Sequence, residues 1–329
     1  MNKFKDVIGY EDIIQYIKNA VSENKISHAY ILNGERRSGK KMLANLFART
    51  LLCENNELEP CNACQSCIQA ESSNNPDIIT VVHEKVGSIG IDEIRTQINN
   101  DILLKPYANQ YKVYIVPDAD KMTEQAQNAL LKTIEEPPAY AVILLLTENV
   151  DQLLPTIQSR CVMLKLRNIR NTLVKEYLVQ QKHIPEYQAQ ICATFAQGNI
   201  GRALELATSE YFNEIKSSAL TLLKQINELD TAEVIINVKK ISEYKIDIID
   251  YFDIMIIWYR DILLYKATKN VDKVIFEDQL KGIEERAMKS SYEGLEVILQ
   301  AIDKAKARIR ANVSFDLVIE LLLLTIKEN

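Results

Sequence analysis

A glycine-rich stretch near the amino terminus has the spacing of a phosphate-binding loop. Gly34 is followed five positions later by Gly39 and then by Lys40, in the sequence LNGERRSGKKML. In such a loop, main-chain N–H groups face phosphate oxygens and the lysine contacts the terminal phosphates. An apolar run before the loop and a helical pattern after it supply the strand and the helix that the motif requires. The stretch predicts either a nucleotide site or a tight turn shaped by the two glycines.

The residues that would hold magnesium and activate water are altered. The loop has Lys41 where a Ser or Thr would bind the metal, and a lysine cannot coordinate one. After the later run KVYIV, the acidic motif begins with Pro117, and Asp118 is shorter than the expected Glu, with Asp120 two residues on. Two independent defects in one hydrolytic site predict that the chain does not hydrolyse ATP itself. They leave ATP binding open.

Four of the six cysteines lie within fifteen residues and form two overlapping C-x-x-C steps after one outlying cysteine. Because the chain shows no export signal, disulfides are not expected. Four thiolates at this spacing can surround one zinc ion, and such a site has no open position for catalysis. The pattern predicts a structural zinc site made by Cys53, Cys61, Cys64 and Cys67.

Composition excludes several classes of protein. A net charge of −6 over 329 residues argues against a surface that wraps nucleic acid. The longest apolar run, Leu317 to Ile326, contains Glu320 and is shorter than the roughly 20 residues of a membrane span. We expect a soluble, cytoplasmic protein without a membrane partner.

The distribution of apolar residues predicts two kinds of structure along the chain. Runs rich in Val, Ile and Leu, typical of parallel strands covered on both faces, alternate with helical patterns in the first half. One such helix, Thr123 to Glu136, is stopped by two prolines. From about Arg167, helix follows helix. The predicted strands are residues 29–34, 77–83, 112–117, 141–147 and 162–166.

Several stretches together resemble the delta-prime clamp-loader subunits of bacterial DNA polymerase III, a family of AAA+ proteins. The resemblance covers nearly the whole chain, although the last helices resemble the family's collar domain only in texture, apart from WYRDILLYKA. It implies an AAA+ α/β domain with a RecA-like parallel sheet over 1–166, with the zinc module at 53–67, a small helical lid domain over 167–208 and an all-helical collar domain for oligomerisation over 209–329. The supporting stretches are FKDVIGYEDIIQYIKNAV, ISHAYILNG, the cysteine insert, KVYIVPDADKMTEQAQNALLKTIEEPP, LLPTIQSRC and GNIGRALEL.

The resemblance also implies roles for individual residues and partners. From spacing alone Arg160 is a surface salt-bridge or capping residue, but in the family the Arg of SRC is an arginine finger that enters a neighbour's ATP site. Thr147 and Arg202 fall at the two sensor positions that read the nucleotide in active members, and they are relics if the loop has lost its chemistry. The implied partners are the motor (gamma/tau) and delta subunits in a pentameric ring. Through that ring, part of the DNA polymerase III holoenzyme, the chain would contribute as a stator to loading the sliding clamp onto primer-template DNA.

Three alternatives stay open at this point. The first is the motor subunit of the same loader, which shares the zinc insert and SRC but normally has an intact loop, so that Lys41 and Pro117 count against it. The second is an autonomous nucleotide-binding regulator unrelated to DNA. The third is direct DNA contact through Lys132 or the basic stretch Asp303 to Arg310, although exposed basic residues on helices are usually only solvated.

Overall fold

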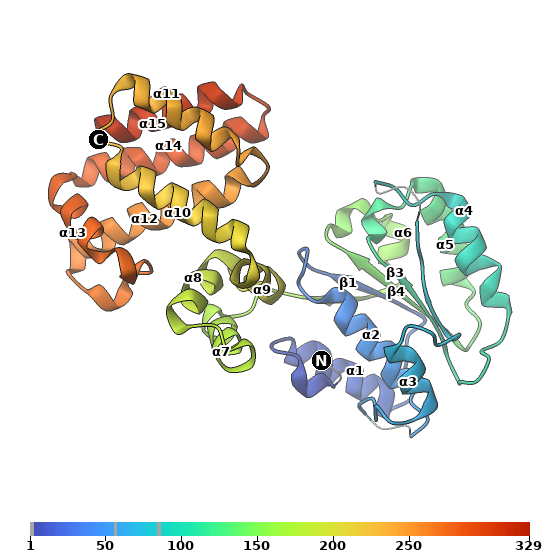
Figure 1. The fold of residues 1–329 in the computed structure, drawn as a ribbon. Helices are drawn as coiled ribbons and strands as arrows, with labels where there is room; N and C mark the ends of the chain where they lie inside the picture. Colours follow the sequence, from blue (N-terminus) through green and yellow to red (C-terminus); the bar gives the residue numbers. More distant parts are fainter. Residues whose placement is uncertain (1–2, 56–57, 84–86) are drawn as a thin grey trace. The chain divides into compact units, whose positions relative to one another are not determined.

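The computed structural model describes residues 3–55, 58–83 and 87–329, with only the main chain of residue 231. The chain divides into two compact units (Figure 1). The first comprises Met1–Tyr177 with Ala196–Arg202, and the second comprises Leu178–Phe195 with Ala203–Asn329. The three-part division at residues 166 and 208 stays a prediction.

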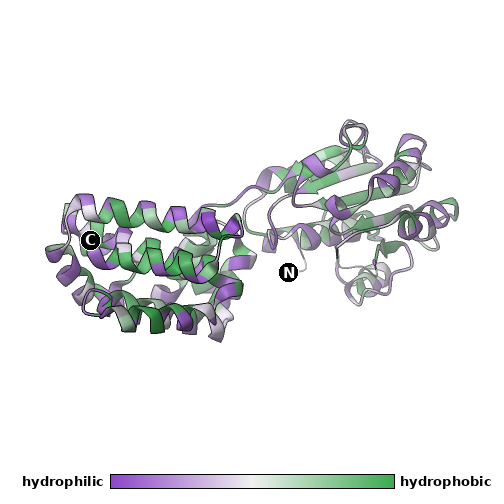
Figure 2. Ribbon diagram, turned by 90° about the horizontal axis from the view of Figure 1, so that it is seen from above, coloured by the Kyte–Doolittle hydropathy of each residue, from purple (hydrophilic) through white to green (hydrophobic). Residues whose placement is uncertain are grey.

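The first unit is built on a five-stranded parallel sheet with the strand order β2-β3-β4-β1-β5. Both faces of the sheet are covered, so β3 and β4 are buried along their whole length and β1 is buried except at Asn33. Figure 2 shows these strands as mainly hydrophobic. The sheet confirms the predicted α/β fold class. The strands are β1 (Ala29–Asn33), β2 (Ile78–Thr80), β3 (Lys112–Val116), β4 (Ala141–Thr147) and β5 (Val162–Lys165).

Helices form the outer layers of this unit. One face of the sheet packs against α1 and α2, through residues such as Ile17 and Phe47. The other face packs against α4, the segment η2 and α5, through residues such as Ile98 and Leu130. The helices are α1 (Glu11–Ser22), α2 (Lys40–Leu51), α3 (Gln65–Glu71), α4 (Ile91–Ile94), α5 (Glu124–Glu135) and α6 (Pro155–Gln158), with η2 over Arg95–Asn99.

The edge strand β2 is shorter than the predicted 77–83. Asp77 is part of a loop anchor, because its carboxylate accepts main-chain hydrogen bonds from Tyr107, Ala108 and Asn109. As an edge strand, β2 pairs with β3 alone, over three residues. The apolar pattern therefore overestimated the paired length of this strand.

The second unit is helical, as predicted. The long helix α12 is apolar on most sides and packs against α10, α13 and α14, which buries Trp258 in the core. The sequence analysis did not predict α13, in which Gly282 and charged residues obscure the apolar face. The helices from residue 171 onward are α7 (Asn171–Lys182), α8 (Glu186–Ala196), α9 (Ile200–Thr208), α10 (Glu210–Gln225), α11 (Thr231–Ser242), α12 (Ile248–Thr268), α13 (Leu280–Lys289), α14 (Tyr292–Arg310) and α15 (Phe315–Glu328).

Within the described residues, no helix combines the length and the apolar character needed to cross a membrane.

Candidate functional site

The glycine loop joins the end of β1 to the start of α2. Gly39 has a φ of 92°, which a glycine adopts without strain. A Cβ atom on Gly34 would lie 2.8 Å from Oγ of Ser38 and 2.9 Å from Cβ of Leu166. The hydroxyl of Tyr10 donates a 2.9 Å hydrogen bond to the carbonyl of Ser38. Both glycines are therefore required by the turn itself, whatever the loop binds.

A segment far along the sequence closes against this loop within the same unit. The side-chain amide of Asn199 donates a 2.8 Å hydrogen bond to the main-chain carbonyl of Arg36. Gly201 lies so close that a Cβ atom there would be 2.2 Å from the carbonyl oxygen of Arg37. These contacts involve residues that the sequence analysis did not single out beyond the motif GNIGRALEL. The loop is thus part of a packed interface inside the first unit.

Lys40 turns back onto its own loop. Its ammonium group donates to the main-chain carbonyls of Gly34 at 2.6 Å and Glu35 at 2.8 Å. Burial lowers its pKa, and carboxylates close to it act in the opposite direction. A bound polyphosphate would have to compete with this negative charge for one lysine. The nearby carboxylates are Glu148, Asp120, Asp118 and Glu35.

Polar atoms gather at the carboxyl ends of the central strands. The residues Asn33 and Thr147 are direct neighbours in the register of β1 and β4, and the main-chain N–H of Gly34 donates to the carbonyl of Thr147 at 3.1 Å. Four buried side-chain atoms here have no hydrogen-bond partner among the described residues: Oδ1 of Asn33, Oγ of Ser38, Oδ1 of Asp120 and Oγ1 of Thr147. A buried polar cluster of this kind fits a nucleotide's polar groups or water, so ATP binding stays a prediction.

Three further positions from the sequence analysis, Arg202, Lys41 and Pro117, follow the carboxyl ends of strands or belong to the segment packed on the glycine loop. The N–H of Arg202 donates to Oδ1 of Asn199 at 3.1 Å, at the start of α9. Lys41 is exposed on the first turn of α2, and Pro117 directly follows β3. Neither Lys41 nor Pro117 presents an oxygen ligand for magnesium. The sensor roles of Thr147 and Arg202 are not tested by this geometry.

Arg160 lies where the parallel strands begin, at the end of the sheet opposite the glycine loop. It precedes β5 by two residues, and Val162 at the start of β5 pairs with Tyr30. Gly34 comes four residues after Tyr30. At about 3.3 Å per residue, the start of the glycine loop is therefore about 13 Å further along the strand direction than the Tyr30–Val162 pair. The guanidinium of Arg160 is 43% exposed and lies 3.1 Å from the carboxylate of Glu135. Arg160 therefore faces away from the loop of its own chain.

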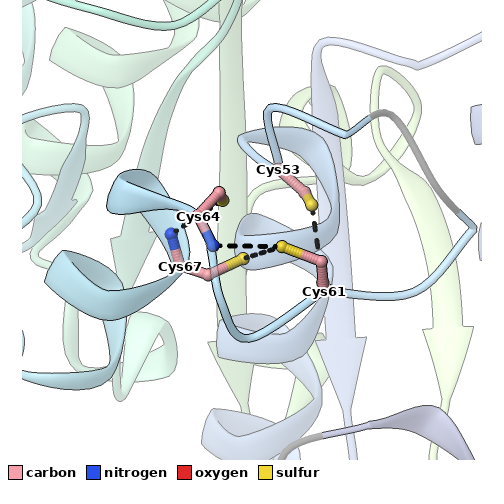
Figure 3. A group of neighbouring side chains, drawn as sticks. All are labelled: Cys53, Cys61, Cys64 and Cys67. Atoms are coloured by element: carbon pink, nitrogen blue, oxygen red, sulfur yellow. Dashed lines mark hydrogen bonds between the residues drawn. The ribbon is translucent and has the colours of Figure 1, made fainter.

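The four cysteines predicted to bind zinc converge on one point (Figure 3). Their sulfur atoms all lie within 4.8 Å of one another, and the sulfurs of Cys61 and Cys67 are 4.0 Å apart. Four sulfurs around zinc, each about 2.3 Å from the metal, lie about 3.8 Å apart in a tetrahedron. The arrangement fits zinc. Within the described residues it is the one group of at least three His, Cys, Asp or Glu side chains close enough to hold a metal.

Local turns create this arrangement of sulfurs. The N–H of Cys64 donates to the sulfur of Cys61 at 3.3 Å, and the N–H of Cys67 donates to the sulfur of Cys64 at 3.4 Å. The main-chain N–H groups of Ala63 and Cys64 lower the pKa of Cys61 to about 6, whereas burial raises those of Cys53 and Cys67. Buried thiolates need a nearby cation, and Zn²⁺ would supply that charge. A structural role of this group stays a prediction.

Two protein-family models match the chain. One, described as DNA polymerase III, delta subunit, matches residues 9–170, and the other, described as DNA polymerase III, delta subunit, C terminal, matches residues 212–328. The chain is also 28% identical to the DNA polymerase III subunit delta′ of Bacillus subtilis, over 96% of this chain and 95% of that protein. The chain belongs to the delta-prime family of DNA polymerase III clamp-loader subunits.

Proteins described as other subunits of DNA polymerase III, or as related to them, are also similar to this delta-prime family chain. DNA polymerase III subunit tau of Bacillus subtilis is 29% identical over 83% of this chain, and the chain spans about half of that protein, 52% of its length. A crystal structure of a DNA polymerase III gamma subunit-related protein from Thermotoga maritima is 20% identical, with a TM-score of 0.45, covering 96% of this chain and 98% of that one.

The two regions named as alternatives for DNA contact differ in how much of their charge is available. Lys132 is exposed on α5. In the basic stretch of α14, the ammonium of Lys306 lies 2.6 Å from the carboxylate of Asp253 in a partly buried ion pair. Part of that charge is therefore used inside the second unit, and direct DNA contact stays an open alternative.

Proposed function

We propose that the chain is the stator subunit of a DNA polymerase III clamp loader and supplies Arg160 to the ATP site of a neighbouring motor subunit. In this proposal it assembles with motor (gamma/tau) and delta subunits in a five-member ring in the cytoplasm. The ring loads the sliding clamp onto primed DNA. Membership of the delta-prime family supports the assembly. The site geometry supports a loader in which the motor subunit binds ATP and this chain supplies the arginine.

The observation that carries the proposal is the placement of Arg160. Its side chain is exposed, and it lies where the strands begin, at the end of the sheet opposite the loop that contains Lys40. A guanidinium in that position cannot reach a phosphate bound by its own chain, but it is free to reach one bound by a neighbour. Arg160 is therefore proposed as an arginine finger in trans.

The chemistry requires only a positioned positive charge. In phosphoryl transfer, negative charge spreads over the oxygens of the transferred group, and an arginine supplied by a neighbour stabilises it. Glu135, at the end of α5, contacts the guanidinium and limits the directions in which it can extend. The chain itself would then need no hydrolysis, in agreement with Lys41 and Pro117 at the two metal-binding positions.

The zinc module has a supporting role in this proposal. Its cysteines follow α2, the helix that begins at the glycine loop, and Lys18 of α1 forms a 2.6 Å ion pair with Glu59 in the insert. Zinc bound by the four thiolates would fix the insert to the face of the sheet that α1 and α2 cover. We propose no catalysis for the metal, because four thiolates leave no open coordination position.

The motor subunit remains the second candidate, because tau-type proteins are similar to this chain. The contacts of Lys40 with its own loop oppose that function, since a motor needs this ammonium for phosphate. The third candidate, a regulator unrelated to DNA, predicts that the chain does not copurify with clamp-loader subunits.

The deciding experiment measures ATP turnover by the reconstituted loader containing Arg160→Ala. We expect normal folding and assembly, with turnover at the one ATP site that Arg160 enters reduced by roughly 10³-fold, the lower end for arginine fingers in other systems, and turnover of the whole loader reduced by the share of that site. Arg95→Ala is the matched control, because Arg95 is an exposed arginine on η2 of the same unit. Unchanged turnover with Arg160→Ala in an assembled loader refutes the finger.

A further inference from the structure

The second unit has a groove between its last two helices that the proposed function does not use. Helices α14 and α15 pack side by side (Figure 1), and a hollow of about 370 Å³ lies between them. This hollow is called the α14–α15 groove below. Its lining comes from these two helices alone and includes Val297, Ala301, Lys304 and Arg308 of α14 and Leu321 and Leu322 of α15.

The floor of the groove is apolar, and its rim exposes large apolar side chains. Leu322 is 3% exposed, whereas Val297 and Leu321 are each 43% exposed, one on each helix. The short side chain of Ala301 leaves room between them. Apolar side chains that are gathered around a hollow and remain in contact with water are typical of a surface that a partner covers.

Two cations stand on one rim of the groove without a counter-charge. Lys304 and Arg308 are exposed and four residues apart, so they lie on the same face of α14, about 6 Å apart along its axis. Neither side chain has an ion-pair partner among the residues that the structure describes, and the described lining residues include no acidic side chain. Like charges at this spacing destabilise a helix. The pair therefore favours a ligand that brings carboxylates.

The groove has one apolar end and one basic end. Val297 comes seven residues before Lys304, which is about 10 Å along α14. A nucleic acid backbone would neutralise Lys304 and Arg308 but would leave the apolar floor uncovered. A helix with one apolar face, and with carboxylates one turn apart beside that face, matches both ends. Charge and apolar surface together therefore favour a protein segment over DNA.

The size of the groove favours one short segment over a folded domain. A volume of about 370 Å³ is at the small end for ligand pockets, and a few side chains fill it. Stable interfaces between folded subunits cover about 800 Å² on each partner, a far larger and flatter surface. The groove therefore suits a single helix that places its side chains between α14 and α15.

We propose that the α14–α15 groove binds an acidic amphipathic helix of a partner protein. The apolar side chains of that helix enter between Val297 and Leu321 and cover Leu322. Two of its carboxylates pair with Lys304 and Arg308. The groove is separate from Arg160, the zinc module and the glycine loop, so a failure of this proposal would leave the proposed function unaffected.

The test measures fluorescence anisotropy with the full, zinc-loaded chain and a fluorescein-labelled helical peptide. The peptide is alanine-based and carries three leucines on one face, with two glutamates one turn apart beside them. Three comparison probes have lysines in place of the glutamates, serines in place of the leucines, or the form of a single-stranded oligonucleotide. We expect saturable binding of the first peptide and at least about tenfold weaker binding of the other three probes. The absence of saturable binding, or equal affinity for the serine peptide or the oligonucleotide, overturns the proposal.

Variants of exposed residues place the binding in the groove. The double change Lys304→Glu with Arg308→Glu turns two attractive pairs into repulsive ones, so we expect the dissociation constant of the glutamate peptide to rise at least about tenfold and the lysine peptide to gain affinity. Ala301→Leu fills the groove and should weaken the glutamate peptide to a similar extent. Lys281→Glu with Lys289→Glu is the matched control, because it makes the same charge change at exposed positions of α13 and should leave binding unchanged. Equal affinity in all folded variants overturns the proposal.

The same titration with the reconstituted loader separates a partner from a neighbouring subunit. We expect the glutamate peptide to bind the assembled loader as it binds the isolated chain. Loss of binding on assembly would show that a subunit of the ring covers the groove, which overturns the proposal of a separate helix.

Discussion

The side-chain amide of Asn199 donates a hydrogen bond to the main-chain carbonyl of Arg36, 163 residues earlier in the sequence. This contact joins the turn before α9 to a loop whose sequence is that of a phosphate cradle. Lys40 contacts the carbonyls of the same loop. The Lys40 ammonium that a nucleotide would use is thus already engaged inside the loop, whereas the main-chain N–H groups that would face phosphates take no part in these contacts. The loop is therefore also a packed part of the first unit, and nucleotide binding stays a prediction.

The first prediction concerns nucleotide turnover by the isolated chain. We expect no magnesium-dependent ATP hydrolysis, because Lys41 and Pro117 remove the metal ligands and Lys40 is held by its loop. An equilibrium titration with a fluorescent ATP analogue, with and without magnesium, followed by a turnover assay on the same sample, checks this. Tight magnesium-dependent binding with hydrolysis would show that the chain is a motor subunit.

A second prediction tests the packing of α9 on the loop. In Gly201→Ala the new Cβ atom would be 2.2 Å from the carbonyl of Arg37, a main-chain atom that cannot rotate away. We expect the free energy of unfolding to fall by about 1–3 kcal/mol, the usual cost of overpacking, despite the better helix propensity of alanine. Gly87→Ala is the control, since nothing lies within 4 Å of its Cβ position. Urea unfolding monitored by circular dichroism compares them, and equal midpoints would contradict the contact.

A third prediction concerns zinc. Protein prepared without chelators should contain about one zinc per chain, and Cys67→Ser should lose it, because Cys67 is a buried member of the cluster. Cys161→Ser is the matched control, since Cys161 lies outside the group and should leave the metal content unchanged. Elemental analysis with circular dichroism measures both. Full metal content in folded Cys67→Ser would show that the four-cysteine site is wrong.

The ion pair of Arg160 leads to a fourth prediction. Glu135→Gln removes the charge 3.1 Å from the guanidinium, but both side chains are more than 40% exposed. Exposed pairs of this kind contribute roughly 0.2–1 kcal/mol, so turnover at the ATP site that Arg160 enters should change by less than about fivefold. The effect should shrink further at high salt. A loss as large as that expected for Arg160→Ala would instead give Glu135 a direct role in catalysis.

Local patterns predicted much of this molecule. Continuous apolar runs predicted all five strands, and the prolines after Glu136 predicted the end of α5. The cysteine spacing predicted a cluster that the structure confirms as able to hold a metal. Each of these signals lies within a short stretch of chain, where residue type and spacing determine the geometry.

What could not be predicted depends on contacts between distant residues. The approach of Asn199 to Arg36 has no local signal, because it depends on how two remote turns meet. The short β2 results from Asp77 binding a loop 30 residues away. Sequence patterns therefore indicated that Lys41 and Pro117 offer no ligand for magnesium, but they did not indicate what the glycine loop packs against.

The last prediction concerns a buried acid in α12. Asp261 is fully buried, and one oxygen accepts hydrogen bonds of 2.9 Å from the main-chain N–H groups of Ile275 and Phe276. Those bonds favour the charged carboxylate, but burial has the larger effect and raises the pKa of Asp261 to about 6. The other oxygen, Oδ1, has no partner among the described residues. The folded state therefore holds a proton on Asp261 more tightly than the unfolded chain does.

Because the folded pKa lies above the unfolded value of about 3.9, the stabilising contribution of this proton is complete below about pH 4 and is lost as the pH rises through about 6. Two pKa units correspond to about 3 kcal/mol. We expect the unfolding free energy of the wild type, minus that of Asp261→Asn, to fall by up to that amount between about pH 4 and pH 7. Denaturant unfolding followed by the emission of Trp258, on the same helix, reports on this unit. A difference that stays constant with pH would mean that main-chain hydrogen bonding, and not burial, sets the ionisation of Asp261.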